Sequence, residues 1–162
     1  MTKRALIAFL LLICVYVFLG VSSLDRQYFV CPIEYKNDLV VRHDQRGSGW
    51  FAANRSGSRV HKGLDLLASV GTPVYAAKSG QVVGAAQNSG MGKYVIIRHR
   101  DAMVTIYGHL SKIAVRRGQR VRQGQVIGSV GKTGNAAAHN MLPHLHFEIR
   151  KSGVPVDPLE YI

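Results

Sequence analysis

Two hydrophobic patterns divide the chain. An uncharged apolar run covers residues 5–24 and consists mostly of Leu, Ile, Val, Phe and Ala. From about residue 58 onward, apolar residues occur in short runs rich in Val, Ile and Tyr, separated by glycine-containing turns. Short β-branched and aromatic runs between turn residues are typical of strands. The second region is therefore predicted to be a mainly β domain.

The expected strands are antiparallel hairpins, because no helical periodicity of any length follows residue 24. The closing segment 154–158 contains Pro155 and Pro158 and is expected to be extended, since proline disfavours helix. The predicted strands are residues 64–67, 74–77, 81–86, 94–98, 103–107, 120–121 and 126–130.

The N-terminal run resembles a segment that enters or crosses a membrane. Lys3 and Arg4 precede it, which is the order of charge and apolar residues in a secretion signal. The run is also close to the ~20 residues that a membrane-spanning helix needs. A cleaved signal peptide and a retained anchor both fit, and the length favours the anchor. We therefore divide the chain into a signal or anchor (1–24), a connector (25–57) and a domain (58–162).

The charge of the chain bears on its location and partners. Lys3 and Arg4 should stay in the cytoplasm, so the rest is exported, either anchored to the inner membrane and facing the periplasm or cell wall, or secreted after cleavage. Lys3 and Arg4 are two of the 21 basic residues in the chain. Residues 25–162 therefore keep 19 basic residues against 9 acidic residues, which gives a net charge of +10. Such charge suits nucleic acid, anionic lipid or a polyanionic cell wall. Export argues against nucleic acid, and a merely solvated positive surface fits equally well.

Alternation in residues 144–149 predicts a strand with a polar face. His144, His146 and Glu148 alternate with apolar residues, and alternate residues of a strand share one face. A solvated strand face is the ordinary explanation, but it seldom carries two histidines and a glutamate. The pattern is typical of a metal site facing a cleft.

A second pattern supplies further ligands. His61 and Asp65 are four positions apart, so both side chains can converge on one ion. Two imidazoles and one carboxylate can hold a catalytic zinc and leave its fourth position open. His109 follows the strand predicted at 103–107, where a strand opening into a loop is a usual place for catalytic groups. Its alternative is a hydrogen-bonded structural histidine, whereas His99, between two arginines, is expected at the surface.

These motifs resemble the lysostaphin/LytM family of zinc metallopeptidases. The resemblance covers most of residues 58–161 and rests on His61-x-x-x-Asp65, Tyr107-Gly-His109-Leu and Pro143-His144-Leu-His146-Phe-Glu148. It implies a compact antiparallel β domain with a narrow groove, and zinc-dependent cleavage of peptides in bacterial peptidoglycan. It also implies residue roles. The zinc ligands are His61, Asp65 and His146, and the catalytic histidines are His109 and His144. Glu148 is expected to orient His144 or His146 by accepting a hydrogen bond.

The sequence departs from the family pattern in one loop. The loop between Gly134 and Pro143 is longer than usual and lacks Ser and Thr; it should flank the groove and affect substrate preference.

The rival function is that of a non-catalytic LytM-like module that binds peptidoglycan and regulates a wall amidase. Such relatives typically lose metal ligands, and this chain keeps them all. An occluded groove would also silence it, and the connector residues that reach the zinc in that case are Asn37, Asp38, His43 or Asp44.

Overall fold

The computed structural model describes residues 5–7, 9–15, 28–55 and 59–162. Residues 5–7 and 9–15 are helical. Within the described ranges, no helix has the length and apolar character needed to span a bilayer. The rest of the predicted signal or anchor lies outside the described residues.

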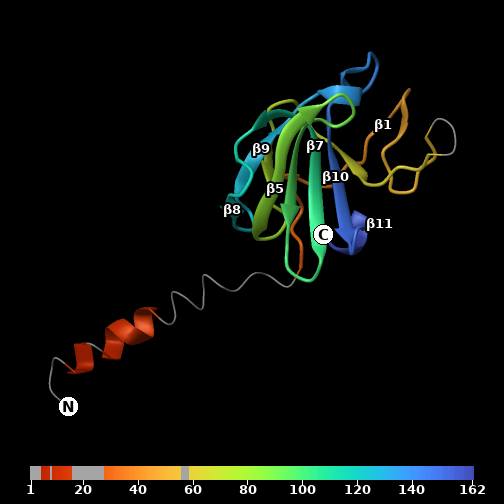
Figure 1. Ribbon diagram of the computed structural model, residues 1–162. Coiled ribbons are helices and arrows are strands. Elements are labelled where there is room, and N and C mark those ends of the chain that lie inside the picture. The colour runs from red at the N-terminus through yellow and green to blue at the C-terminus, as the bar shows by residue number, and fades with distance from the viewer. Residues whose placement is uncertain (1–4, 8, 16–27, 56–58) are drawn as a thin grey trace.

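Residues from 64 onward form a nine-stranded antiparallel sheet (Figure 1). Its main path runs β11-β10-β7-β6-β5-β8, with β3 paired to β10 and with β9 paired to both β4 and β7. This confirms the predicted mainly β, antiparallel domain. The strands are β3 (Leu64–Leu67), β4 (Pro73–Tyr75), β5 (Gly80–Asn88), β6 (Gly92–Arg98), β7 (Met103–Ile113), β8 (Arg120–Val121), β9 (Val126–Val130), β10 (His144–Lys151) and β11 (Val154–Val156).

The strand β7 is longer than predicted, and this changes the setting of His109. The residue lies inside β7 and not in a loop after it. Up to Gly108, β7 pairs with β10, and from Leu110 it pairs with β9. His109 sits at this change of partner with a φ of +61°, in the left-handed region. The side chain is therefore aimed by a local distortion of a paired strand.

One further expectation was wrong, and another, the extended segment 154–158, was right except at Pro158. His99 is buried rather than exposed, because its ring packs against Phe29 and its nitrogens contact Ser79 O at 2.9 Å and Thr105 Oγ1 at 2.8 Å. Pro158 begins a 3-10 helix, η2 (Pro158–Glu160), rather than continuing an extended segment. Proline is tolerated in a first helical turn, where its missing N–H has no partner anyway.

The core lies against one face of the sheet and includes part of the connector. Leu145, Phe147 and Ile149 of β10 are fully buried, as the alternation predicts. Phe29 and Ile33, from the connector, join the same apolar cluster. Burying apolar side chains from both segments stabilises the domain, at about 25 cal/mol per Å² removed from water.

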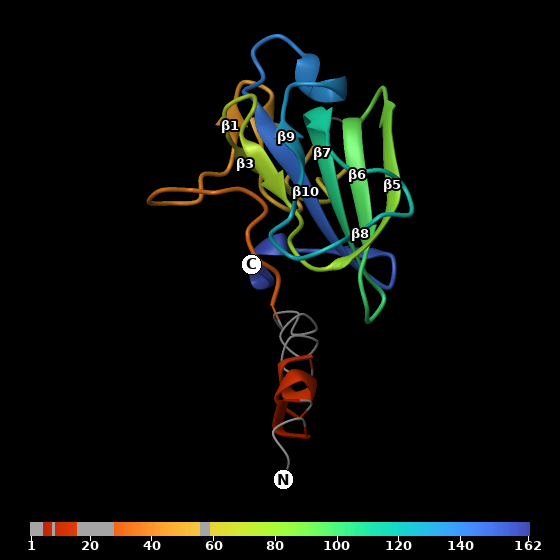
Figure 2. The same ribbon diagram turned by 90° about the vertical axis from the view of Figure 1, so that its left-hand side faces the viewer.

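The connector also forms a short hairpin, β1 (His43–Asp44) and β2 (Gly47–Ser48). Figures 1 and 2 both show β1 near the loop that follows the 3-10 helix η1 (Gly134–Ala137). Three hydrogen bonds join the hairpin to this loop: Arg46 Nε donates to His139 O at 3.1 Å, Asn140 Nδ2 donates to Gln45 Oε1 at 3.0 Å, and Leu142 N donates to Asp44 Oδ2 at 2.8 Å.

Candidate metal centre

The strand β10 lies between β3 and β7, and this pairing assembles the site. His146 is the direct partner of Asp65 on β3 and of Gly108 on β7. In an antiparallel pair, directly opposed side chains lie on the same face a few ångströms apart. His109 follows Gly108, so strand register brings three of the predicted site residues to one place.

Three donor atoms converge there. His61 Nε2 lies 3.0 Å from Asp65 Oδ1 and 3.1 Å from His146 Nδ1, and these last two atoms are 2.8 Å apart. All three residues are buried. Two imidazole nitrogens and one carboxylate oxygen form the donor set of a catalytic zinc site, and a triangle of this size suits bonds of about 2.0–2.2 Å. The described residues could thus hold a metal ion here.

Both metal-facing imidazoles have their other nitrogen occupied. His61 Nδ1–H donates to Trp50 O at 2.8 Å, and His146 Nε2–H donates to Glu148 Oε1 at 3.0 Å. A ring that donates from one nitrogen presents a lone pair at the other. These partners therefore select the tautomers that a metal requires. Glu148 orients His146, one of the two alternatives expected from the sequence.

Asp65 divides its two oxygens between different partners. Oδ1 faces the two histidines, whereas Oδ2 accepts hydrogen bonds from Arg42 Nη2 at 3.1 Å and Arg55 Nη2 at 3.0 Å. Burial alone would raise the pKa of Asp65, but the hydrogen bonds from His146 and His61 lower it well below its usual range. The carboxylate is therefore ionised and keeps one oxygen for a metal.

Two carboxylates beside His146 favour its protonated form in the absence of metal. Burial disfavours the charged imidazole, but its hydrogen bonds to Asp65 and Glu148 outweigh this and raise its pKa to about 9. Glu148 is in turn bound by Arg150 Nη2 at 2.6 Å. In the metal-free protein a proton thus occupies the place where a bound cation would replace it.

His109 and His144 form a second histidine pair beside these donors. Their ring centroids are 5.0 Å apart, and the ring of His109 lies 5.7 Å from that of His146. His109 Nδ1–H donates to Thr133 O at 2.9 Å, and His144 Nδ1–H donates to Leu142 O at 2.7 Å. In both rings Nε2 is left as the free acceptor.

Burial keeps this second pair neutral. It lowers the pKa of His109 to about 3, with the positive charge of His146 adding to the effect. Burial also lowers the pKa of His144. A neutral imidazole carries an unprotonated nitrogen, so the pair can act as transient proton acceptors in a reaction and not as fixed cations.

The site opens into a groove of about 930 Å³. Arg46, Arg55, Arg59 and Lys62 line its rim, as do Asn135, Ala138 and Met141 of the long loop expected to flank it. The four connector residues that we considered as occluding groups do not line the groove: Asn37, Asp38, His43 and Asp44. Asp44 instead faces Arg42, at 2.6 Å.

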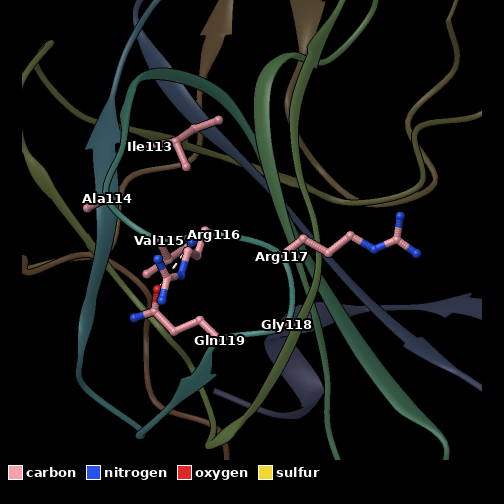
Figure 3. A pocket seen from close by; sticks show the side chains of 7 residues that line it. All are labelled: Ile113, Ala114, Val115, Arg116, Arg117, Gly118 and Gln119. Atoms are coloured by element: carbon pink, nitrogen blue, oxygen red, sulfur yellow. Dashed lines mark hydrogen bonds between the residues drawn. The ribbon is translucent and has the colours of Figure 1, made fainter.

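A second hollow, of about 800 Å³, lies against residues 113–119 (Figure 3). Arg116 and Gln119 lie together there, and Arg117 points away from them. Its seven lining residues include no His, Cys, Asp or Glu. It therefore offers none of the usual metal-ligand or acid–base side chains, and the histidine groove is the candidate site.

Fold and site together define a class: an antiparallel β domain with a candidate three-donor metal centre and two adjoining histidines, as in a metallopeptidase. The chain belongs to peptidase family M23, whose model matches residues 59–158. The resemblance to lysostaphin/LytM-type peptidases is thereby confirmed.

Relatives of known sequence support the family. Peptidoglycan DD-endopeptidase ShyA of Vibrio cholerae is 42% identical over 141 residues, which are 86% of this chain and 31% of that protein. The lipoprotein NlpD/LppB homolog of Pseudomonas aeruginosa is 44% identical over 115 residues, 70% of this chain and 36% of that protein. The chain thus spans about a third of the length of these curated relatives.

Solved structures agree on the fold. The catalytic domain of lysostaphin from Staphylococcus simulans is 32% identical with a TM-score of 0.61, over 70% of this chain and 88% of that one. A zinc-containing peptidase from Vibrio cholerae is 32% identical with a TM-score of 0.66, over 82% of this chain and 39% of that one.

Sequence reasoning missed the groups that hold the metal-facing and histidine side chains in place. Arg42 and Arg55 bind Asp65, and the carbonyls of Trp50, Thr133 and Leu142 bind three histidines. The two arginines lie in the irregular connector, where no periodicity marks a buried position. Backbone carbonyls carry no residue-specific signal at all.

Proposed function

We propose that this chain is a zinc-dependent endopeptidase that hydrolyses peptide bonds in bacterial peptidoglycan. The observation that carries the proposal is the convergence of the His61, Asp65 and His146 donor atoms within 4.8 Å, beside two neutral histidines. Membership of family M23 and the likeness to ShyA, named a peptidoglycan DD-endopeptidase, support the substrate.

In this proposal His61 Nε2, Asp65 Oδ1 and His146 Nδ1 hold the zinc. When bound, the ion lowers the pKa of a water molecule and polarises the carbonyl of the scissile peptide. Glu148 and the carbonyl of Trp50 keep the two imidazoles in the tautomers that bind metal, and Arg42 and Arg55 bind Oδ2 of Asp65 and leave Oδ1 for the metal.

The two remaining histidines handle protons. One accepts the proton of the attacking water at Nε2 and later delivers it to the leaving amine. The other donates a hydrogen bond from Nε2 to the oxygen that becomes negative, and therefore acts in its protonated form, because Nδ1–H stays bound to a backbone carbonyl. In both rings Nδ1–H is bound to a backbone carbonyl, which leaves Nε2 for proton transfer, and we assign the two roles to His109 and His144.

The test is digestion of purified peptidoglycan by the full chain, with mass spectrometry of the released fragments. New peptide termini that appear with wild-type protein, and that disappear on chelation and with His146→Ala, are the expected result. Binding of zinc and of peptidoglycan without release of fragments would instead support the regulatory module.

The order of basic and apolar residues in the N-terminal segment supports an activity outside the cytoplasm. We propose that residues 1–24 direct export and that the domain acts on the cell wall, either held at the inner membrane or released after cleavage. The basic residues 3 and 4 before the apolar run support this orientation. Membrane fractionation and N-terminal sequencing of the mature protein distinguish the anchored from the released form.

A further inference from the structure

Arg42 is a fully buried arginine of the connector whose guanidinium joins two carboxylates. Nε and Nη2 donate to Asp65 Oδ2 at 3.3 and 3.1 Å, and Nη1 donates to Asp44 Oδ1 at 2.6 Å. Burying such a set of charges is costly, and apolar side chains of similar volume often serve stability as well. The charge at this position therefore points to a role beyond stability.

The first carboxylate belongs to the candidate metal centre. Arg42 takes Oδ2 of Asp65 and so leaves Oδ1 facing His61 and His146. The backbone reinforces this placement, because Arg42 N donates to Asp65 O at 2.8 Å. Arg42 thus holds both the main chain and the side chain of this metal-facing residue.

The second carboxylate leads to His144. Asp44 Oδ2 accepts a hydrogen bond from Leu142 N at 2.8 Å, and Leu142 O accepts one from His144 Nδ1–H at 2.7 Å. The peptide groups of Leu142 are therefore held on both sides, by the connector through N–H and by the histidine through C=O. This chain of contacts returns to the metal centre, because His144 Nε2 lies 3.8 Å from Asp65 Oδ2.

We propose that Arg42 and Asp44 are positioning residues that couple the orientation of Asp65 to that of His144. The connector then helps to orient the residues of the site. This inference rests on the proposed function for the role of His144. Loss of Asp44 releases Leu142 and His144 without touching a metal donor. Loss of Arg42 removes the contacts to both Asp65 and Asp44.

Asp44→Ala tests the end near His144. Hydrogen exchange at the Leu142 amide should become at least about tenfold faster, because the amide loses its hydrogen-bond acceptor. Zinc affinity, measured by calorimetric titration, should stay near the wild-type value, while kcat falls by roughly 10–100-fold with little change in KM. Asp38→Ala is the matched control, since Asp38 is an exposed acidic residue of the same connector outside the groove.

Arg42→Lys and Arg42→Gln test the residue that contacts both carboxylates. Lysine keeps the charge but cannot bridge two carboxylates with a planar fork. Both variants should therefore lose zinc affinity by roughly 10–100-fold and also expose the Leu142 amide to exchange. Arg55→Gln is the control, because Arg55 binds the same oxygen of Asp65 without contacting Asp44: zinc affinity should fall, and exchange at Leu142 should stay at the wild-type rate.

The outcomes separate this inference from the proposed function. Circular dichroism confirms folding, and Arg42→Lys serves if Arg42→Gln does not fold. Wild-type exchange and turnover in Asp44→Ala would overturn the coupling, even if the protein hydrolyses peptidoglycan. If the wild type hydrolyses nothing, yet the zinc and exchange measurements change as described, the coupling stands and the proposed peptidase function fails.

Discussion

Asp65 on β3 and His146 on β10 are directly opposed in their strands, and Asp65 Oδ1 lies 2.8 Å from His146 Nδ1. The distance follows from strand register and not from a mobile loop. Two of the three donors of the candidate metal centre are therefore set by the main sheet, while His61 approaches on the segment just before β3.

Substitutions should separate metal binding from turnover. His146→Ala is expected to lose bound zinc and hydrolysis together, because it removes a donor. His109→Asn should keep zinc and reduce turnover by at least ~100-fold, because it removes a proton acceptor that contributes about 10²–10⁴-fold. Asn is chosen because it tolerates the positive φ of His109 better than Ala does. Metal analysis and fragment release measure the two effects, and near-normal hydrolysis by His109→Asn would exclude its catalytic role.

Glu148 should matter through His146. Glu148→Ala removes the acceptor of the Nε2–H, so the ring loses its preferred tautomer and orientation. Zinc affinity is expected to fall by roughly 10–100-fold. Calorimetric titration measures this, with Glu160→Ala as the control because Glu160 is an exposed acid of η2. Equal affinities in the two variants would show that the Glu148 contact does not tune the site.

The metal-free protein should lose stability in acid, partly through His109. Burial holds its pKa at about 3, against ~6.5 in an unfolded chain. Between these values the unfolded state binds the extra proton, so the free energy of unfolding falls as pH falls. The contribution of this residue approaches ~1.4 kcal/mol per pH unit.

Chemical denaturation of chelator-treated wild type and His109→Asn at pH 7 and pH 5 checks this expectation. The wild type should lose more stability than the variant between these values, because only the wild type carries this buried imidazole. Parallel losses in both proteins would show that His109 is not protonated preferentially on unfolding.

Gly63 should tolerate no side chain. A Cβ there would lie 2.5 Å from Phe147 O and 2.9 Å from Glu148 Cγ. Gly63→Ala is expected to lower the free energy of unfolding by about 1–3 kcal/mol and to weaken zinc binding, since β10 must move. Gly90→Ala is the control, because its Cβ would meet nothing nearer than 3.7 Å. Thermal unfolding and zinc titration of both variants give the comparison.

The sequence predicted the sheet and the site residues to different extents. Alternation in residues 144–149 predicted the buried apolar face of β10, because side-chain direction in a strand is a local property. The same alternation placed His144, His146 and Glu148 on the other face. It did not predict that β7 continues through His109, because the change of pairing partner at that residue depends on β9 and β10.

Other features had no local signal. His99 is flanked by two arginines, yet Phe29, far away in the chain, covers it. Arg42 lies 23 positions from Asp65, in a segment without strand or helix periodicity. Both become buried only when distant segments pack together.

The sequence by itself therefore determined the approximate positions of the strands, the types of metal-donor side chain and the family pattern that links them. Tertiary structure decided which atoms meet, which carbonyl or carboxylate orients each imidazole, and that the connector contacts the site. The physical reason is that side-chain alternation and donor chemistry belong to single residues and their neighbours. Buried hydrogen bonds instead depend on register and packing between segments that are distant in the chain.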